Sequence, residues 1–316
     1  MSRTRDLRLP PTATGRLDRA LADALGLGRA AVKRAFREGS VRVEGRRARP
    51  SDPATPGSLV TLEIEPPAGP PAPEPAAPLT VLLEHPRLLV VDKPAGIAVH
   101  PLAPGEAGTL ANAVVARFPE CAAASPDPRE GGAVQRLDVG TSGCVLFARD
   151  RGAWEQVHEA LRGRSVEKVY LALVDGRVSS GGVVSVPLAQ RGGRAVAAPD
   201  PEAEERLRSK GARPRAAETH YEIAERFPRH TLLRVRIVTG VTHQIRAHLA
   251  HLGFPVAGDL EYGGAGLPGL GRQFLHAWRL ALDAPGSGRI QSESPLPGDL
   301  EAVLAKLGSA AGHGRP

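Results

Sequence analysis

The segment at residues 131–150, GGAVQRLDVGTSGCVLFARD, places charged side chains directly before an apolar run. Arg136 and Asp138 precede a Gly-Thr-Ser-Gly turn, and residues 144–148 after the turn have the composition of a buried strand. Carboxylates in enzymes act as nucleophiles or stabilise charge that develops on a substrate. An acid held at the mouth of a rigid strand can reach a bound molecule, so the position of Asp138 needs a chemical explanation.

Two other groups of residues invite a chemical interpretation that their spacing does not support. His243, His248 and His251 are separated by five and three residues, which does not place all three on one helical face, and no cysteine lies nearby in the sequence. Residues 263–271, GGAGLPGLG, are rich in glycine but lack the strand-to-helix fingerprint of a phosphate-binding loop. We therefore expect neither a metal site nor a phosphate-binding loop.

The elements that must position Asp138 follow from the hydrophobic pattern downstream of residue 79. The predicted strands cover residues 79–84, 88–91, 144–148, 169–174, 219–224 and 231–238, and the predicted helices cover 110–118, 154–161 and 243–252. Interleaved strands with few helices are typical of an α+β domain with a mixed, largely antiparallel sheet. Residues 192–215 are polar and predict a mobile insertion loop, and the tail from Gly308 is predicted to be disordered.

A proline-rich segment divides the chain. Residues 66–78, PPAGPPAPEPAAP, contain seven prolines, which exclude a helix or a central strand and favour an extended spacer. We therefore expect a small domain at residues 11–65, a linker at 66–78, a larger domain at 79–305 and a tail at 306–316.

The small domain has the pattern of two helices followed by short strands, an α/β arrangement. Leu17, Leu21 and Leu25 share one helical face, and glycines at positions 26 and 28 end that helix. A second helix over residues 29–38 turns Val32 and Phe36 inward. Alternating apolar residues at 41–43 and 60–64 then predict strands.

Charge suggests a possible partner. The chain has 41 basic and 34 acidic residues, a formal net charge of +7 and a pI near 10.0. Phosphate backbones attract such a surface, although the arginine excess is also what codon bias produces in a chain rich in Ala, Gly and Pro. Arg29, Lys33 and Arg37 lie at i, i+4 and i+8 and form one cationic stripe, which is either a solvated helix face or a binding surface.

Composition also bears on location. No apolar run approaches the roughly 18–20 residues of a membrane helix, and the N-terminal MSRTRDLRLPP lacks the hydrophobic core of a signal peptide. The two cysteines, Cys121 and Cys144, do not predict a disulfide framework. We expect a cytoplasmic protein without a membrane partner.

Five ordered segments resemble the RluA/RluD-type pseudouridine synthases. They are LLVVDKPAGIAVHP (88–101), QRLDVGTSGCVLFA (135–148), EKVYLALVDG (167–176), TGVTHQIRAHLAHLGFPVAGDLEYGG (239–264) and FLHAWRLAL (274–282). Residues 15–50 resemble the small RNA-binding module first recognised in a small-subunit ribosomal protein. By that second resemblance the candidate RNA contacts are Arg29, Lys33, Arg34, Arg37, Arg46 and Arg47.

The resemblance implies an enzyme that isomerises uridine to pseudouridine in structured RNA, without a cofactor. It implies that Asp138 is the nucleophile, that Arg246 keeps its carboxylate charged, and that Tyr170 stacks on the target base. Arg136 is expected to fill the gap that the flipped base leaves or to grip a flanking phosphate. Thr141, His243 and Gln244 are further candidates for substrate binding. Large-subunit ribosomal RNA is a better candidate substrate than transfer RNA, and nothing requires more than a monomer.

Two positions depart from the family pattern. Gln135 stands where the family usually has a histidine, and Val241 stands where it usually has an arginine. Glutamine cannot carry a proton at neutral pH, and valine removes a charge that could hold RNA phosphate. These departures leave open an alternative, a non-catalytic RNA-binding or ribosome-assembly protein with the same fold.

Overall fold

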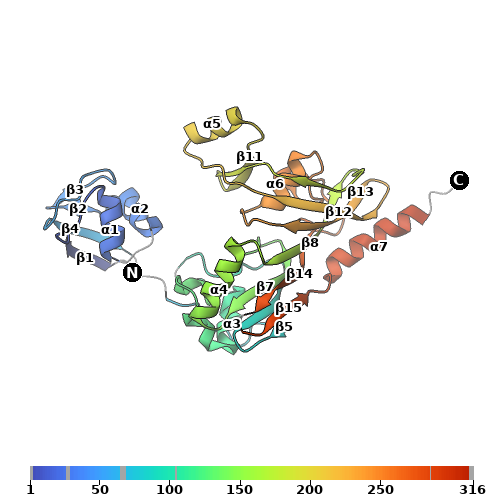
Figure 1. Ribbon diagram of the computed structural model, residues 1–316, viewed down its shortest axis with the longest axis horizontal. Coiled ribbons are helices and arrows are strands. Elements are labelled where there is room, and N and C mark those ends of the chain that lie inside the picture. The colour runs from blue at the N-terminus through green and yellow to red at the C-terminus, as the bar shows by residue number, and fades with distance from the viewer. Residues whose placement is uncertain (1–2, 26–28, 65–68, 104, 285, 313–316) are drawn as a thin grey trace. The chain divides into compact units, whose positions relative to one another are not determined.

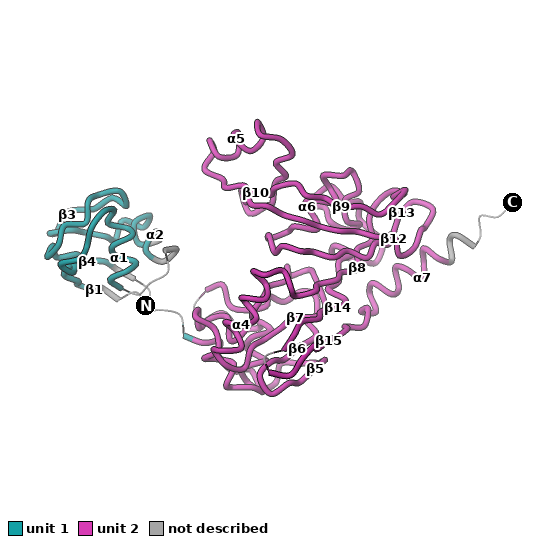
Figure 2. The backbone as a smooth tube through the Cα atoms, viewed as in Figure 1, with its two compact units in different colours: residues 1–69 teal, residues 70–316 magenta. Residues whose placement is uncertain are grey.

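The computed structural model describes residues 3–25, 29–64, 69–103, 105–284 and 286–312 (Figure 1). The chain forms two compact units, residues 1–69 and 70–316 (Figure 2). The predicted helix break at glycines 26 and 28 lies outside the described residues. Within the described part of the chain, no helix is long and apolar enough to cross a membrane.

The first unit packs two helices on a four-stranded antiparallel sheet with strand order β1-β4-β2-β3. Its elements are β1 (Arg3–Arg8), α1 (Leu17–Leu25), α2 (Arg29–Glu38), β2 (Arg42–Val43), β3 (Arg46–Arg47) and β4 (Leu59–Ile64). Leu17, Leu21, Val32 and Phe36 are buried in one core with strand residues, as their helical spacing predicted. Strand β1 was not predicted, because its sequence is mostly charged.

The second unit is built on one nine-stranded sheet. Its strands are β5 (Thr80–Glu84), β6 (Leu88–Lys93), β7 (Ser142–Ala148), β8 (Glu167–Asp175), β9 (Gly182–Val184), β12 (Thr219–Arg226), β13 (His230–Ile237), β14 (Leu275–Ala284) and β15 (Gly288–Glu293). The order is β5-β6-β7-β14-β8-β13-β12-β9, and β15 pairs with β14. Every pairing is antiparallel except that of β7 with β14. The predicted α+β class and largely antiparallel sheet are confirmed.

Helices cover this sheet where the sequence predicted them (Figure 1). They are α3 (Leu110–Arg117), α4 (Arg151–Arg162) and α6 (Gln244–His251). Helix α4 buries Ala153 and Val157 in a core that contains β7 residues, and α6 buries Ile245 and Leu249 against β8 and β13. Helix α4 therefore packs beside β7, the strand that follows Asp138, and α6 packs beside β8, the strand that carries Tyr170.

Residues 192–215 are not the loop that their polarity predicted. They belong to a hairpin of β10 (Leu188–Arg191) and β11 (Arg194–Ala197), followed by α5 (Pro201–Ser209). The hairpin turns through Gly192 and Gly193, both at positive φ. Pro201 begins α5, and the Asp200 side chain accepts a hydrogen bond from the Ala203 amide. The core of this segment consists mostly of small alanines, which hydrophobicity alone did not reveal.

The C-terminal prediction was also wrong. Helix α7 (Gly298–Gly312) includes residues 308–312 of the segment expected to be disordered, and residues 313–316 lie outside the described residues. The helix buries Leu300 and Val303 in a core with Phe274. Leu304 and Leu307 pack against the same core, so the apolar face of the helix reaches the start of the segment that was expected to be disordered.

Part of the proline-rich segment packs on the second unit instead of forming a bare spacer. The Asn112 side chain in α3 donates to the Ala72 carbonyl at 2.7 Å, and the Glu74 amide donates to the Asn112 carbonyl. The Glu74 carboxylate accepts from the Gly108 amide at 2.9 Å. An extended proline-rich backbone keeps its carbonyls outside any internal ladder, so they remain available to such donors.

Candidate active site

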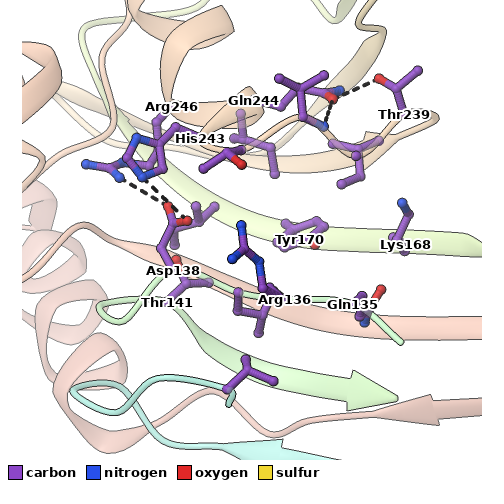
Figure 3. Close-up of a pocket in the computed structure, with 18 of the residues that line it drawn as sticks. Gln135, Arg136, Asp138, Thr141, Lys168, Tyr170, Thr239, His243, Gln244 and Arg246 are labelled. Carbon is purple, nitrogen blue, oxygen red and sulfur yellow. Dashed lines mark hydrogen bonds and ion pairs between the residues drawn. The ribbon is translucent and has the colours of Figure 1, made fainter. Parts of the chain in front are cut away.

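A cavity of about 1030 Å³ opens in the second unit beside β8. It is bounded by the loop before β7, the turn at residues 237–243 and the start of α6 (Figure 3). The parallel pairing of β7 with β14 lies here and spans only two residue pairs. The short pairing leaves the loop before β7 outside the ladder, so its side chains can face the cavity.

The close approach of β7 to β14 depends on Gly143. Its φ is +116°, and a Cβ at this position would lie 2.2 Å from the Ala277 carbonyl oxygen. Next to it, the buried Ser142 hydroxyl lies 2.9 Å from His276 Nδ1. The Thr-Ser-Gly sequence therefore seats the start of β7 against β14 and fixes where the preceding loop ends.

Several hydrogen bonds hold the loop that carries Asp138. The Thr141 amide donates to the Asp138 carbonyl at 2.9 Å, and the Gly96 amide donates to the Val139 carbonyl at 2.8 Å. Arg272 donates to the Gly140 carbonyl at 3.0 Å. The backbone that carries the carboxylate is therefore fixed from three sides, which restricts where that carboxylate can point.

Lys93 adds a fourth constraint. Its side chain is fully buried, and its ammonium donates to the carbonyls of Pro94, Ile97 and Val139 at 2.8, 2.8 and 3.1 Å. Burial lowers the pKa of Lys93 to about 8, which still leaves it protonated at neutral pH. Three carbonyl acceptors match the three N–H donors of an ammonium. Lys93 therefore connects the turn after β6 to the Asp138 loop through hydrogen bonds to both.

Lys93→Met is expected to lower the free energy of unfolding of the second unit by about 2–3 kcal/mol, because it leaves buried carbonyls without a donor. Urea denaturation followed by tryptophan fluorescence would measure this, since both tryptophans, Trp154 and Trp278, lie in that unit. Lys210→Met, at an exposed lysine, is the matched control and should shift stability by less than about 0.5 kcal/mol. Equal stability of the two variants would contradict the role given to Lys93.

Asp138 and Arg246, 108 residues apart in sequence, meet at the cavity. Arg246 Nη1 donates to Asp138 Oδ2 at 3.1 Å (Figure 3). The same guanidinium donates from Nε and Nη2 to both oxygens of Asp259, at 2.6 and 2.8 Å, and from Nη2 to Glu261 at 2.7 Å. One arginine thus contacts three carboxylates, and only the Asp138 carboxylate lines the cavity.

The electrostatics of this group favour a permanently charged arginine. Burial alone disfavours the cation, but the hydrogen bonds and charges of Asp259, together with Asp138 and Glu261, outweigh it and raise the pKa of Arg246. The Asp259 side chain is almost completely buried. The bidentate contact with Asp259 fixes the plane of the guanidinium and leaves Nη1 aimed at Asp138.

His243 and Tyr262 extend the network of side chains around Asp138 and Arg246. His243 Nε2 lies 3.7 Å from Asp138 Oδ1, and its Nδ1 lies 3.0 Å from the Tyr262 hydroxyl. The guanidinium carbons of Arg246 and Arg194 each lie 4.8 Å from the Tyr262 ring centroid. His243 has a φ of +58°, a strained value for a residue that is not glycine. Such strain at the start of α6 is typical of a position held for function.

Tyr170 lines the cavity from β8 and is 7% exposed. In Figure 3 it lies between Asp138 and Lys168 in the view. Burial, with a smaller contribution from the Asp138 charge, raises the pKa of Tyr170 well above its usual value. The phenol is therefore neutral near pH 7, and its ring presents a flat apolar face to whatever enters the cavity.

The other predicted substrate contacts divide into two groups. Arg136 is exposed at the cavity, with its side chain in the open part of the site (Figure 3). Thr141 and Gln244 also line the cavity, but their side chains form hydrogen bonds within the protein. Thr141 Oγ1 accepts a hydrogen bond from the Gln273 side chain. The Gln244 side-chain amide forms hydrogen bonds with Thr239, Val241, Glu218 and Thr219. The geometry gives these two side chains a positioning role.

Both departures from the family pattern line the cavity. The Gln135 amide lies 3.5 Å from the Cys144 carbonyl. Val241 also packs in an apolar cluster with Leu188 and Ala195 of the hairpin and Ala247 of α6. The valine therefore packs the hairpin against α6 at the edge of the cavity.

The candidate RNA contacts of the first unit lie on α2 and β3. Lys33 and Arg37 are exposed on α2, and Arg46 and Arg47 are exposed on β3. The side chains of Arg29 and Arg34 lie outside the described residues. The described part of the cationic stripe therefore faces solvent, as either interpretation of it requires.

Sequence reasoning missed Asp259, Glu261 and Tyr262, which hold Arg246. They follow it by 13, 15 and 16 residues on a turn with no hydrophobic period, and the acidic character of Asp259 and Glu261 was the only available signal. It also missed Lys168, whose place two residues before Tyr170 on a strand was a usable signal.

His248, one of three histidines whose spacing did not support a metal site, has both ring nitrogens 2.8 Å from other partners, the Thr219 hydroxyl and the Val186 carbonyl. Across the described ranges, no cluster of three His, Cys, Asp or Glu side chains could hold a metal.

Comparisons with known proteins agree on one family. The family model described as RNA pseudouridylate synthase matches residues 87–251. An uncharacterized RNA pseudouridine synthase of Chloroflexus aurantiacus is 41% identical over 311 residues, which cover 96% of this chain and 94% of that protein. The ribosomal large subunit pseudouridine synthase D of Xanthomonas campestris is 37% identical over 97% of this chain and 93% of its own length.

Solved structures give the same fold. Human RNA pseudouridylate synthase domain containing 4 superposes with a TM-score of 0.56 at 22% identity, covering 72% of this chain and 92% of that one. Human RNA pseudouridylate synthase domain containing 1 gives 0.55 at 24% identity, covering 76% and 98%. These similarities cover the second unit's architecture and support its mixed sheet.

Proposed function

The chain belongs to the RNA pseudouridylate synthase family, and on that premise we propose that it isomerises uridines of large-subunit ribosomal RNA with Asp138 as nucleophile. The observation that carries the proposal is the Asp138 carboxylate at the cavity, held by Arg246 at 3.1 Å. The substrate class rests on relatives whose names state that they act on the large ribosomal subunit. An enzyme that modifies ribosomal RNA would work in the cytoplasm, and we expect it to act as a monomer.

The reaction breaks the bond between C1′ of the ribose and N1 of uracil and joins C1′ to C5 instead. The proton on C5 must leave and N1 must gain one, so the reaction needs no redox partner. Asp138 would attack the sugar or base, or stabilise the charge that develops when the glycosidic bond breaks. Arg246 would keep its carboxylate ionised and oriented. Tyr170, as a neutral phenol, would stack on the flipped uracil.

The base must first leave the RNA stack, which costs a few kcal/mol. Arg136 is exposed at the cavity and would occupy the vacated position in the helix or grip the flanking phosphate. The cavity of about 1030 Å³ is large enough for a nucleotide and its neighbours.

A pseudouridine map of ribosomal RNA from a strain that lacks the gene tests the proposed function. Sites that disappear on deletion and return when the wild-type gene is restored would identify the enzyme and its substrate together. Lost sites in transfer RNA alone would move the substrate there. A map without any change would favour the alternative, a non-catalytic RNA-binding or ribosome-assembly protein.

The first unit is proposed to add RNA affinity through its cationic stripe. Lys33→Ala/Arg37→Ala in the full chain should weaken RNA binding and reduce the slope of log K against log salt by about two, one for each phosphate that is no longer neutralised. Filter binding of ribosomal RNA over a salt series measures this. The pair Arg8→Ala/Arg19→Ala removes the same charge from exposed positions of the same unit and is the control. If the two double variants gave the same slope of log K against log salt, α2 would not be part of the RNA interface.

A further inference from the structure

Lys168 is a buried cation that the mechanism above does not use. It is 8% exposed, and burial lowers its pKa to about 8. Lys93 is buried as deeply but donates three hydrogen bonds, whereas the described residues offer Lys168 neither a hydrogen-bond acceptor nor a carboxylate. The Lys168 ammonium therefore lies on the cavity wall without a hydrogen-bond partner among the described residues, and such a cation is suited to bind an anion that enters the cavity.

The ammonium faces the cavity. Successive side chains on a strand alternate between faces, so Lys168 and Tyr170 on β8 point to the same side. Both line the cavity, and Figure 3 shows Lys168 extended toward the turn that carries Thr239. Its Nζ lies 3.9 Å from the place that a Cβ on Gly240 would occupy. Lys168 therefore sits about 7 Å along the strand from Tyr170, on the far side from Asp138.

The surroundings of this end of the cavity are suited to an anion. Among the residues that line the cavity, Asp138 is the single carboxylate, and Arg246 already pairs with it. Arg162, Arg164 and Arg215 line the same cavity. A uracil stacked on Tyr170 with its sugar at Asp138 would leave Lys168 beyond the base, where it could meet a phosphate of the neighbouring RNA backbone.

We propose that Lys168 binds an RNA phosphate next to the target uridine and thereby positions the flipped nucleotide along β8. This inference rests on the proposed function, because it takes RNA as the molecule in the cavity. A partly desolvated ammonium on a cavity wall attracts a phosphate more strongly than a fully exposed one does, because the effective dielectric constant is lower there.

The test compares Lys168→Met with Lys210→Met, which removes the same charge from an exposed position. The probe is large-subunit ribosomal RNA transcribed in vitro, which carries no modification. Lys168→Met should weaken binding about tenfold at moderate salt and reduce the slope of log K against log salt by about one, whereas Lys210→Met should change neither. Lys168→Arg, which keeps the charge, should restore the slope.

Stability provides the second readout. Tryptophan-monitored urea denaturation of the free enzyme should show Lys168→Met at least as stable as wild type, because the variant loses a partly desolvated charge that pairs with no described residue. Unchanged salt slope in Lys168→Met, or a loss of stability in this variant, would overturn the inference. The two proposals fail separately: a wild-type enzyme that forms no pseudouridine in this RNA refutes the proposed function, whereas the slope of its RNA binding still tests Lys168.

Discussion

Asp138→Asn is expected to abolish pseudouridine formation, with a loss on the order of 10⁴-fold or more in the single-turnover rate, while RNA affinity stays within about threefold. Asparagine has nearly the shape of aspartate and can still accept the hydrogen bond from Arg246 through its amide oxygen. It carries no negative charge and is a poor nucleophile. The substitution therefore removes the proposed chemistry and keeps the geometry of the loop.

Complementation of the deletion strain makes the same comparison in cells. Asp138→Asn should leave unmodified the sites that wild type restores. The control is Asp283→Asn at an exposed position of β14, which should restore every site. If the Asp138→Asn variant restored the sites, the catalytic assignment would fail. A parallel loss of tryptophan-monitored stability would attribute the defect to folding.

The parts that local sequence could predict are those that depend on neighbours along the chain. Residues 144–148 were recognisable as a strand, because a continuous apolar run between turn signals is a local pattern. The place of Asp138 at the mouth of that strand followed directly. The same reasoning found the helix that carries Arg246, whose apolar residues Ile245 and Leu249 recur at helical spacing.

The features of the fold and the site that local sequence could not predict depend on contacts between residues far apart in the chain. Asp259 is defined by its bidentate contact with Arg246, and no period or composition marks the turn where it lies. Hairpin β10–β11 and α5 pack through alanines, which carry little hydrophobic signal, so β11 and α5 were mistaken for a loop. The role of Lys93 also depends on contacts that local sequence does not show. Its ammonium bonds to three carbonyls and the residue does not line the cavity, so Lys93 supports the Asp138 loop from behind.

Arg246→Met should both stop catalysis and destabilise the second unit. The substitution leaves Asp259 buried and charged without its bidentate partner, which should cost about 3–5 kcal/mol of unfolding free energy. It also leaves the Asp138 carboxylate without the donor that orients it, so the single-turnover rate should fall by about 10²–10³-fold in the molecules that remain folded. Denaturation by tryptophan fluorescence and rapid-quench kinetics measure the two losses.

A second substitution separates the two losses. Arg246→Met/Asp259→Asn removes the stranded charge together with its partner, so most of the lost stability should return, because removing both members of a buried pair is far less costly than removing one. Activity should stay at the level of the single variant, since Asp138 still lacks its guanidinium. The control Asp259→Asn alone should keep measurable activity, because Arg246 retains Glu261 and Asp138 as partners. Recovery of the reaction rate in step with stability would mean that Arg246 acts only through the fold, and that Asp138 needs no charged partner.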